Sequence, residues 1–418
     1  MPGLRPHAYH LAAAVLAALG GSAPATAAVH DVHTHRFDNG LTLHVATGHA
    51  APVAAVQAWV GVGAADEATD EAGLAHLVEH MLFKGSAGYA TGELVRAIEH
   101  GGGELNAWTA LDHTVYHAVL ASAHVDVAVH ALGDALVDPR LERHELARER
   151  EVVLEEIRQG SDDPARGVAQ CLFSTAFVHH PYRRPVIGTA AQLARVDDRG
   201  VLAFFRRHYV ADNLTLVVTG DVDPARVQRS VGRRFAAMPT GRPARARPLE
   251  PAQAAPRITW AEREVGEAYV AVGFHVPPLR HPDAAALDVA ALLLGQNESA
   301  RLPRALRDRA GLATSAHASL HALRDPGLLV LSATGPRRAA DTLVGRLAGE
   351  AVALATEVTA DELERARIAA EAAYAEQQMK DIKSGARNNG QTAAMKGVMH
   401  LVNDEEIKAI AEYVSKLK

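Results

Sequence analysis

Two histidines and a glutamate occur together in the segment His76-Leu77-Val78-Glu79-His80. In an α-helix, residues four apart lie one above the other, so both imidazoles could donate a ring nitrogen to one metal ion, with Glu79 beside it. Apolar residues recur around them at helical spacing and predict an opposite face that packs on a core. An HxxEH pattern alone is also compatible with surface residues of an amphipathic helix.

A third metal ligand must come from elsewhere in the chain, because a catalytic zinc usually takes three protein ligands and leaves its fourth position to water. The charged segment 142–157 contains no Gly or Pro, which predicts a helix. Glu149 and Glu156 lie seven residues apart in it, two turns along one face. Either carboxylate could reach a metal, and local spacing does not choose between them.

Further motifs accompany HxxEH in a fixed order. They are HMLFKG (80–85), LNAWT (105–109), DHTVY (112–116), HPY (180–182) with VIG (186–188), and NLTLVVTGD (213–221). Together they resemble the pitrilysin and mitochondrial processing peptidase superfamily of inverted-motif zinc peptidases, over about residues 30 to 375.

That resemblance implies one Zn²⁺ per chain, ligated by His76, His80 and Glu156. The family places its third ligand about 70 to 80 residues after the motif, and Glu156 follows His80 by 76 residues. Glu79 would be the general base, and Glu149 would orient a ligand from behind. For Glu149 the alternative is a solvated partner in (i, i+4) ion pairs.

The resemblance also implies how a peptide is held. Asn106 and Ala107 would belong to an edge strand that pairs with the extended substrate backbone, with ordinary sheet pairing as the alternative. In the second half, the family often presents an arginine and a tyrosine seven residues apart. Arg307 matches the arginine, but Thr314 stands at the tyrosine position. Since Thr cannot project a phenol, we expect a heterodimer whose related subunit supplies the arginine and tyrosine pair.

Alternating strand and helix patterns predict an α+β fold with two related α/β layered domains of the processing-peptidase type, the second apparently incomplete. The expected strands are 41–46, 54–62, 104–109, 114–120, 214–219 and 269–274; the expected helices are 93–100 capped by Thr91, 122–137 capped by Ser122, 284–294 and 301–309. The zinc-bearing domain is predicted as 28–240, a Pro- and Arg-rich linker as 241–256, and the truncated second domain as 257–378.

Residues 379–418 differ in composition from the rest of the chain. Lys84 is the only lysine up to Met379, whereas six lysines follow it. This tail resembles the end of a class I cytochrome c, with Met395 at the axial position, but the chain has no Cys-x-x-Cys-His, so haem binding is not expected. A fusion or assembly artefact, or a simple amphipathic helix, would explain the tail.

Residues 1–27 have the features of a signal peptide: Arg5, an apolar run over 11–19, and small residues at 25–27. We therefore expect an exported, soluble periplasmic protein with no membrane span. The net charge of −6 and isolated arginine pairs argue against nucleic acid as a partner. The histidines at 30, 33 and 35 could capture a metal, or could simply alternate along a first strand.

Three functions are consistent with these observations. A zinc endopeptidase acting on short or unfolded peptides explains the most residues. A non-catalytic or assembly subunit of a peptidase-like heterodimer is the alternative, favoured by Thr314 and the unusual tail. An electron-transfer protein is nearly excluded by the missing haem-attachment motif.

Overall fold

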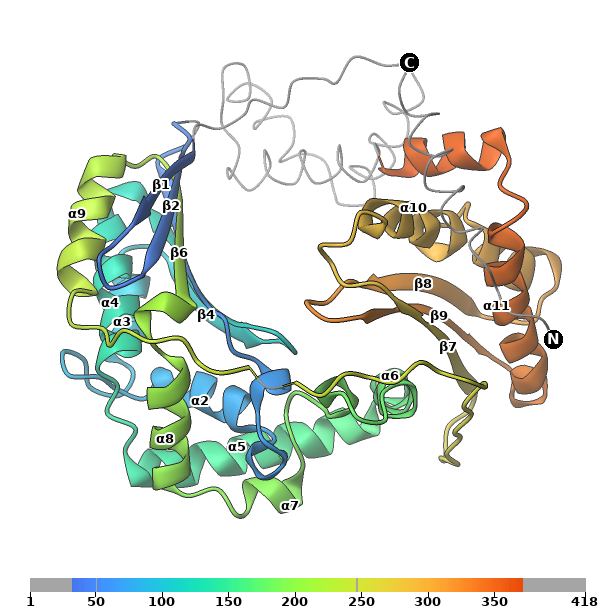
Figure 1. Ribbon diagram of the computed structural model, residues 1–418, viewed down its shortest axis with the longest axis horizontal. Coiled ribbons are helices and arrows are strands. Elements are labelled where there is room, and N and C mark those ends of the chain that lie inside the picture. The colour runs from blue at the N-terminus through green and yellow to red at the C-terminus, as the bar shows by residue number, and fades with distance from the viewer. Residues whose placement is uncertain (1–31, 50, 246, 371–418) are drawn as a thin grey trace.

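Two β-sheets, each covered by helices, organise the computed structural model, which describes residues 32–49, 51–245 and 247–370 (Figure 1). The first sheet has six strands in the order β1-β2-β6-β3-β5-β4, and the second has three in the order β7-β9-β8. The α+β prediction is therefore confirmed. The predicted signal peptide 1–27 and tail 379–418 lie outside the described residues.

The first sheet is built from strands that mostly begin and end within two residues of their predicted positions. Its strands are β1 Val32–Arg36, β2 Thr42–Thr47, β3 Val53–Val60, β4 Glu104–Thr109, β5 Thr114–Ala121 and β6 Leu214–Gly220. Along β3, buried and half-buried residues alternate, which is the pattern of a strand with one face on a core. β6 lies between β2, which it pairs in parallel, and β3, which it pairs antiparallel.

Helices of the first unit pack on this sheet or on one another. They are α2 Leu74–Leu82, α3 Glu93–His100, α4 Val125–Val137, α5 Arg143–Asp162, α6 Pro164–Ala176, α7 Ala190–Leu193, α8 Asp198–His208 and α9 Pro224–Arg234. α4 and α9 lie on the face of the sheet that points away from the second unit (Figure 1). Asp163, Asp197 and Asp223 cap α6, α8 and α9 through their side chains, as expected for aspartate.

The two predicted caps of this unit are wrong. Gly92 is the N-cap of α3, and the Thr91 hydroxyl donates instead to the Lys84 carbonyl. The Glu93 carboxylate accepts from the Ala90 N–H at 2.8 Å, so a glutamate closes the turn before this helix. Ser122 opens a 3₁₀ turn, Ser122–His124, and α4 begins only at Val125.

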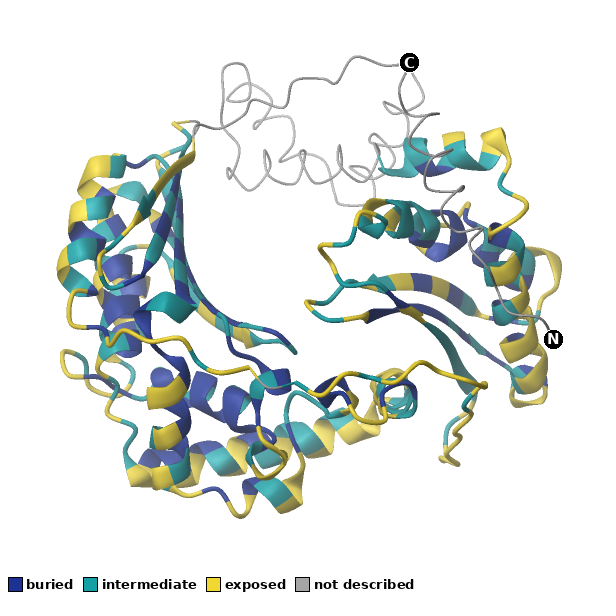
Figure 2. Ribbon diagram, in the orientation of Figure 1, coloured by how far each residue is buried: buried dark blue, intermediate teal, exposed yellow. Residues whose placement is uncertain are grey.

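The second unit repeats part of the first on a smaller scale. Its strands are β7 Ala268–Val276, β8 Ser315–His321 and β9 Gly327–Gly335, covered by α10 Ala284–Gly295, the π-helical turn η6 Pro303–Arg309 and α11 Ala340–Leu354. Its core gathers apolar residues from α10, η6, β9 and α11. Most of β7 is only half-buried, in contrast to β3 (Figure 2). Among the described residues, the second sheet therefore has fewer strands than the first, and its strand β7 is less buried than β3.

A third apolar cluster joins the two units. Phe177 and Tyr182 of the first unit and Leu328 and Val330 of β9 are its main members, and Leu172 of α6 packs against it. Between α9 and β7, the described residues of segment 241–256 form no helix or strand. Across the described residues, no helix is long and apolar enough to cross a membrane.

Candidate metal centre

Helix α2 presents the two histidines because its other face is buried. Six apolar residues of this helix are at most 3% exposed: Leu74, Ala75, Leu77, Val78, Met81 and Leu82. The N-cap of the helix is Gly73, whose φ of 99° is a left-handed conformation that glycine adopts without strain. The Glu67 carboxylate accepts from the N–H groups of Gly73 and Ala75, so the buried first turn has a partner.

Helix α5 brings a carboxylate to the two imidazoles. Glu156 Oε2 lies 3.7 Å from His76 Nε2, and Glu156 Oε1 lies 3.8 Å from His80 Nε2. The ligand atoms of these three residues all lie within 4.8 Å of one another. In the part of the chain that the structure describes, no other three His, Cys, Asp or Glu side chains come together in this way.

Glu149 occupies a different place from Glu156 and is not grouped with both imidazoles. Its Oε2 atom lies 3.1 Å from His80 Nδ1, and its Oε1 atom lies 2.8 Å from Lys84 Nζ. When His80 Nδ1 donates to this carboxylate, the lone pair of His80 Nε2 points toward His76 and Glu156. Glu149 is itself buried, so this contact is not a solvated pair on the helix surface.

His76 has the protonation state that a metal ligand needs. Burial, together with the nearby His80 ring, lowers the pKa of His76 to about 4, so the imidazole is neutral near pH 7. The centroids of the two histidine rings are 4.7 Å apart. His76 Nδ1 is buried and has no hydrogen-bond partner among the described residues.

Glu79 lies on the same helix but is held by a strand. Thr109, the last residue of β4, donates its hydroxyl to Glu79 Oε2 at 2.5 Å. Burial raises the pKa of Glu79 above its ordinary value, and the hydrogen bond from Thr109 opposes that shift. A carboxyl group with a raised pKa beside a metal site is suited to accept and return a proton.

Asn106 and Ala107 lie on β4, at the edge of the first sheet. Among the described strands β4 pairs only with β5, so its other edge carries unpaired backbone groups. Because β4 ends at Thr109, the open edge and the Glu79 carboxylate are connected by one short stretch of backbone. The geometry is compatible with strand addition by an extended peptide.

Arg307 and Thr314 lie in the second unit. The guanidinium of Arg307 makes its hydrogen bonds and ion pairs, among the described residues, with Glu298 at 2.5 Å and Asp308 at 2.8 Å. The Thr314 hydroxyl is bonded to Glu267 and to the Thr334 carbonyl. The structure does not bring Arg307 into contact with the triad of His76, His80 and Glu156.

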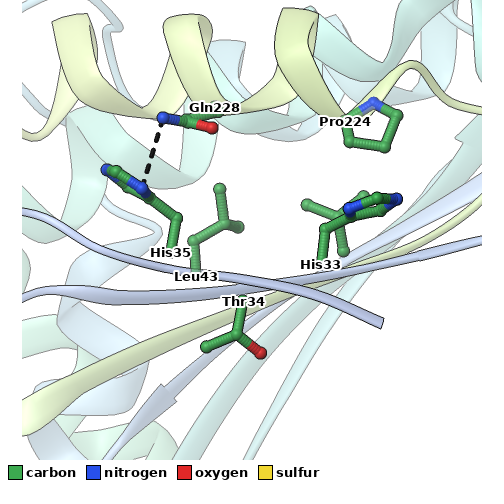
Figure 3. A pocket seen from close by; sticks show the side chains of 7 residues that line it. His33, Thr34, His35, Leu43, Pro224 and Gln228 are labelled. Atoms are coloured by element: carbon green, nitrogen blue, oxygen red, sulfur yellow. Dashed lines mark hydrogen bonds between the residues drawn. The ribbon is translucent and has the colours of Figure 1, made fainter. Parts of the chain in front are cut away.

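The histidines of β1 line a small cavity of about 160 Å³ (Figure 3). His33 and His35 point to the same side, toward α9, whereas Thr34 points away from it (Figure 3). His35 Nδ1 lies 3.3 Å from Gln228 Nε2. Two imidazoles without a third ligand do not make a metal site like that of α2, and metal capture by this segment stays a prediction; residue 30 lies outside the described residues.

Thr109, Lys84 and Glu67 belong to the site's surroundings but were not found by sequence reasoning. Thr109 stands at the end of the LNAWT motif, which was the one available signal. The roles of Lys84 and Glu67 depend on contacts that no local spacing encodes.

Comparison with known proteins agrees with this geometry. Residues 44–190 match the family described as insulinase (peptidase family M16), and residues 199–370 match the peptidase M16 inactive domain. An uncharacterized zinc protease of Mycobacterium tuberculosis is 33% identical over 298 residues, which cover 69% of this chain and 67% of that protein. The chain belongs to peptidase family M16.

Two solved structures show the same architecture. A protease from Helicobacter pylori superposes with a TM-score of 0.79 at 25% identity, covering 92% of this chain and 96% of that one. A peptidase M16 inactive domain from Pseudomonas fluorescens superposes with a TM-score of 0.73 at 18% identity, covering 92% and 95%. The second likeness concerns the fold alone. Since the relatives are named zinc proteases, the family implies a zinc cofactor.

Proposed function

We propose that this chain is a zinc-dependent endopeptidase that hydrolyses peptide bonds in short or unfolded peptides. The observation that carries the proposal is the convergence of His76, His80 and Glu156 within 4.8 Å, with Glu79 one residue from a ligand. Family membership supports the same reaction.

The three side chains fit zinc by their chemistry. Two imidazoles and one carboxylate are a donor set that catalytic zinc sites use, and such sites keep a fourth position open. His80 is oriented by Glu149 from behind, which is the arrangement that fixes a ligand histidine in one tautomer. Zinc held in this way lowers the pKa of a bound water to about 7 and polarises a carbonyl group.

Glu79 is the residue that moves the proton in this proposal. Its carboxylate takes a proton from the attacking water and returns it to the leaving amine of the cleaved peptide. Thr109 holds one of its oxygens at 2.5 Å, which leaves the other oxygen to face the reacting groups. Because burial raises the pKa of Glu79, the carboxylate is a better base than an exposed glutamate.

The substrate in this proposal is an extended peptide backbone. An unpaired edge of β4 recognises main-chain groups, which any unfolded segment offers, so Asn106 and Ala107 would contribute pairing and little side-chain selectivity. A folded protein would have to expose such a segment first. This is the reason for proposing short or unfolded peptides.

A related subunit and an exported location complete the proposal. Arg307 is engaged by two carboxylates of its own unit, and Thr314 offers no phenol, so a partner chain would supply the arginine and tyrosine that stabilise the substrate oxygen. The basic, apolar and small-residue order of residues 1–27 supports export to the periplasm.

The alternative is a non-catalytic or assembly subunit of a heterodimer. The engagement of Arg307 by Glu298 and Asp308 favours it, because that guanidinium is then not free for a substrate carbonyl. Such a subunit would bind zinc without turning over peptides.

Peptide hydrolysis by the purified protein, with and without a related subunit, tests the proposal. Glu79→Gln should keep its zinc and lose about 10²- to 10⁴-fold in rate. Glu155→Gln, an exposed acid on α5, is the matched control and should retain the wild-type rate. Zinc binding without cleavage under every pairing would support the assembly subunit and reject the peptidase.

A further inference from the structure

A buried group of charges sits where the two units meet. Asp112, 6% exposed, accepts from Arg247 Nη1 at 2.5 Å, from the Tyr182 hydroxyl at 2.9 Å and from the Arg324 N–H at 2.9 Å. Arg247 also reaches Asp66 at 2.9 Å and Asp325 at 2.7 Å. We call these six residues the junction cluster: Asp66, Asp112, Tyr182, Arg247, Arg324 and Asp325.

The junction cluster draws its members from three parts of the chain. Asp66, Asp112 and Tyr182 belong to the first unit, whereas Arg324 and Asp325 lie between β8 and β9 of the second. Arg247 belongs to the segment that connects the two units and is only 7% exposed. The Arg247 guanidinium therefore bonds to carboxylates of both units from the segment that connects them.

The contacts within the cluster favour the charged forms of Asp112 and Arg247. Burial alone would raise the pKa of Asp112, but the Arg324 N–H and the Arg247 guanidinium lower it below its ordinary value. Burial likewise opposes the charge on Arg247, while Asp66, Asp325 and Asp112 raise the pKa of that guanidinium. A buried ion pair is weak evidence for stability, but its directional bonds hold one geometry.

One member of the cluster, Asp112, lies in the same hairpin as Thr109, the hydrogen-bond partner of Glu79. Thr109 ends β4, and Asp112 follows three residues later in the turn before β5. This turn is held by backbone bonds from Ala64 to Ala110 at 3.1 Å and from Ala65 to Leu111 at 2.8 Å. A displacement of Asp112 would therefore change the position of Thr109, since only two residues separate them.

We propose that the junction cluster is a positioning device through which the second unit sets the placement of Thr109 against the Glu79 carboxylate. The inference rests on the proposed peptidase function for its kinetic consequence only. The Arg324 N–H donates directly to Asp112, and Asp325 acts on Asp112 through the Arg247 guanidinium that both carboxylates share. Asp112 in turn holds the hairpin turn, and the turn positions β4 at the edge where a peptide would pair. A unit that carries no metal ligand would in this way control the geometry of the base.

Asp325→Asn tests the proposal with a small change. The side chain of Asp325 is 34% exposed and Arg247 keeps Asp66 and Asp112, so the variant should fold. Amide hydrogen exchange in residues 104–121 should become about tenfold faster, the equivalent of one charged hydrogen bond. Asp126→Asn, which breaks the surface pair with Arg226, is the matched control and should leave this exchange unchanged. Unchanged exchange in Asp325→Asn would overturn the proposal.

Coupling to Thr109 gives the second readout. In a peptide-cleavage assay, Asp325→Asn should lower kcat about tenfold with zinc content unchanged, and Asp325→Glu should restore part of the rate. When Thr109 is already replaced by Val, Asp325→Asn should lower kcat no further. If Asp325→Asn lowers kcat by the same factor in Thr109→Val as in the wild type, the two residues act independently and the proposal is contradicted. If the wild type cleaves no peptide, the proposed function fails, and hydrogen exchange alone still decides this inference.

A second variant covers the case in which Asp325→Asn does not fold. Arg247→Lys keeps the positive charge but removes the planar fork that reaches three carboxylates. The same acceleration of exchange in 104–121 is expected, and wild-type protection in this variant would overturn the proposal.

Discussion

The two units share a three-stranded antiparallel pattern and use it differently. In the first unit the order β3-β5-β4 leads to an edge strand beside the metal centre, and in the second the order β7-β9-β8 repeats it. The first α-helix after β3 is α2, and the first α-helix after β7 is α10. α2 carries His76, Glu79 and His80, whereas α10 reads AAALDVAALLLG and offers no metal ligand but Asp288.

The contrast between α2 and α10 shows that the shared strand-and-helix arrangement does not by itself produce the group of His76, His80 and Glu156. One face of α2 presents two half-buried imidazoles because its other face is fully packed, while α10 has apolar residues on most of its surface. The first unit also supplies α5, whose two glutamates complete and support the triad. The second unit has the framework and, by the junction cluster, a mechanical role.

Removal of a proposed zinc ligand on α2 should have the largest effect. His80→Ala should reduce zinc affinity by more than the about 10- to 100-fold typical of residues that only support a ligand. Asp288→Ala, on the exposed side of α10, should leave zinc binding unchanged. Metal content of both purified variants measures the contrast, and equal zinc in His80→Ala and the wild type would remove His80 from the ligand set.

Core truncations in the two helices should separate packing from chemistry. Leu77 in α2 and Leu294 in α10 are both 0% exposed, so Leu77→Ala and Leu294→Ala should each cost about 2 to 5 kcal/mol of unfolding free energy. Denaturant unfolding measures these losses. Only Leu77→Ala should also weaken zinc binding, because it loosens the helix that holds both imidazoles. Weaker zinc binding in Leu294→Ala but not in Leu77→Ala would contradict the assignment of the site to α2.

Loss of the support behind His80 should have an intermediate effect. Glu149→Gln should weaken zinc binding about 10- to 100-fold, since the amide no longer fixes the ring as a charged acceptor. Glu145→Gln is the matched control, because Glu145 is equally buried on the same helix but contacts Arg148 and His144 instead. Zinc titration should find the control at the wild-type affinity, and a common loss in both would point to a general effect of helix charge.

The smallest effect concerns the connection between the units. Burial would raise the pKa of Glu250, but N–H groups of His180, Val178 and His179, with Arg257, lower it to about 2. A carboxylate with a depressed folded-state pKa stabilises fully above its ordinary pKa near 4.5 and loses that contribution as the pH falls toward 2. Glu250→Gln should therefore cost about 1 to 2 kcal/mol at pH 7.

Unfolding curves at several pH values measure this loss. The difference between Glu250→Gln and the wild type should shrink between pH 4.5 and pH 2, and a difference independent of pH would show that the carboxylate charge is not what stabilises the connection.

Much of the fold and the triad could be predicted because their signals are local or carried by motifs. Alternation along β3 and the apolar spacing of α2 are read directly from the sequence. Glu156 was placed by its position in a recognised pattern, since helical spacing alone left Glu149 equally eligible. The structure separates the two through the direction in which each side chain points.

What the sequence could not supply depends on contacts between distant segments. Thr109 meets Glu79 across 30 residues, and Arg247 meets Asp112 across 135, so neither pair leaves a local pattern. The caps failed for a different reason: Thr91 and Ser122 have suitable hydroxyls, but nearby carbonyl and carboxylate groups compete for them. Residue preferences for the N-cap position do not predict such competition from groups elsewhere in the fold.

Anomalous diffraction at the zinc edge from crystals grown with zinc tests the central claim most directly. We predict one strong peak per chain, within bonding distance of His76 Nε2, His80 Nε2 and a Glu156 oxygen. A zinc peak elsewhere, or a Glu156 side chain turned away from an ion bound to the two imidazoles, would contradict the account.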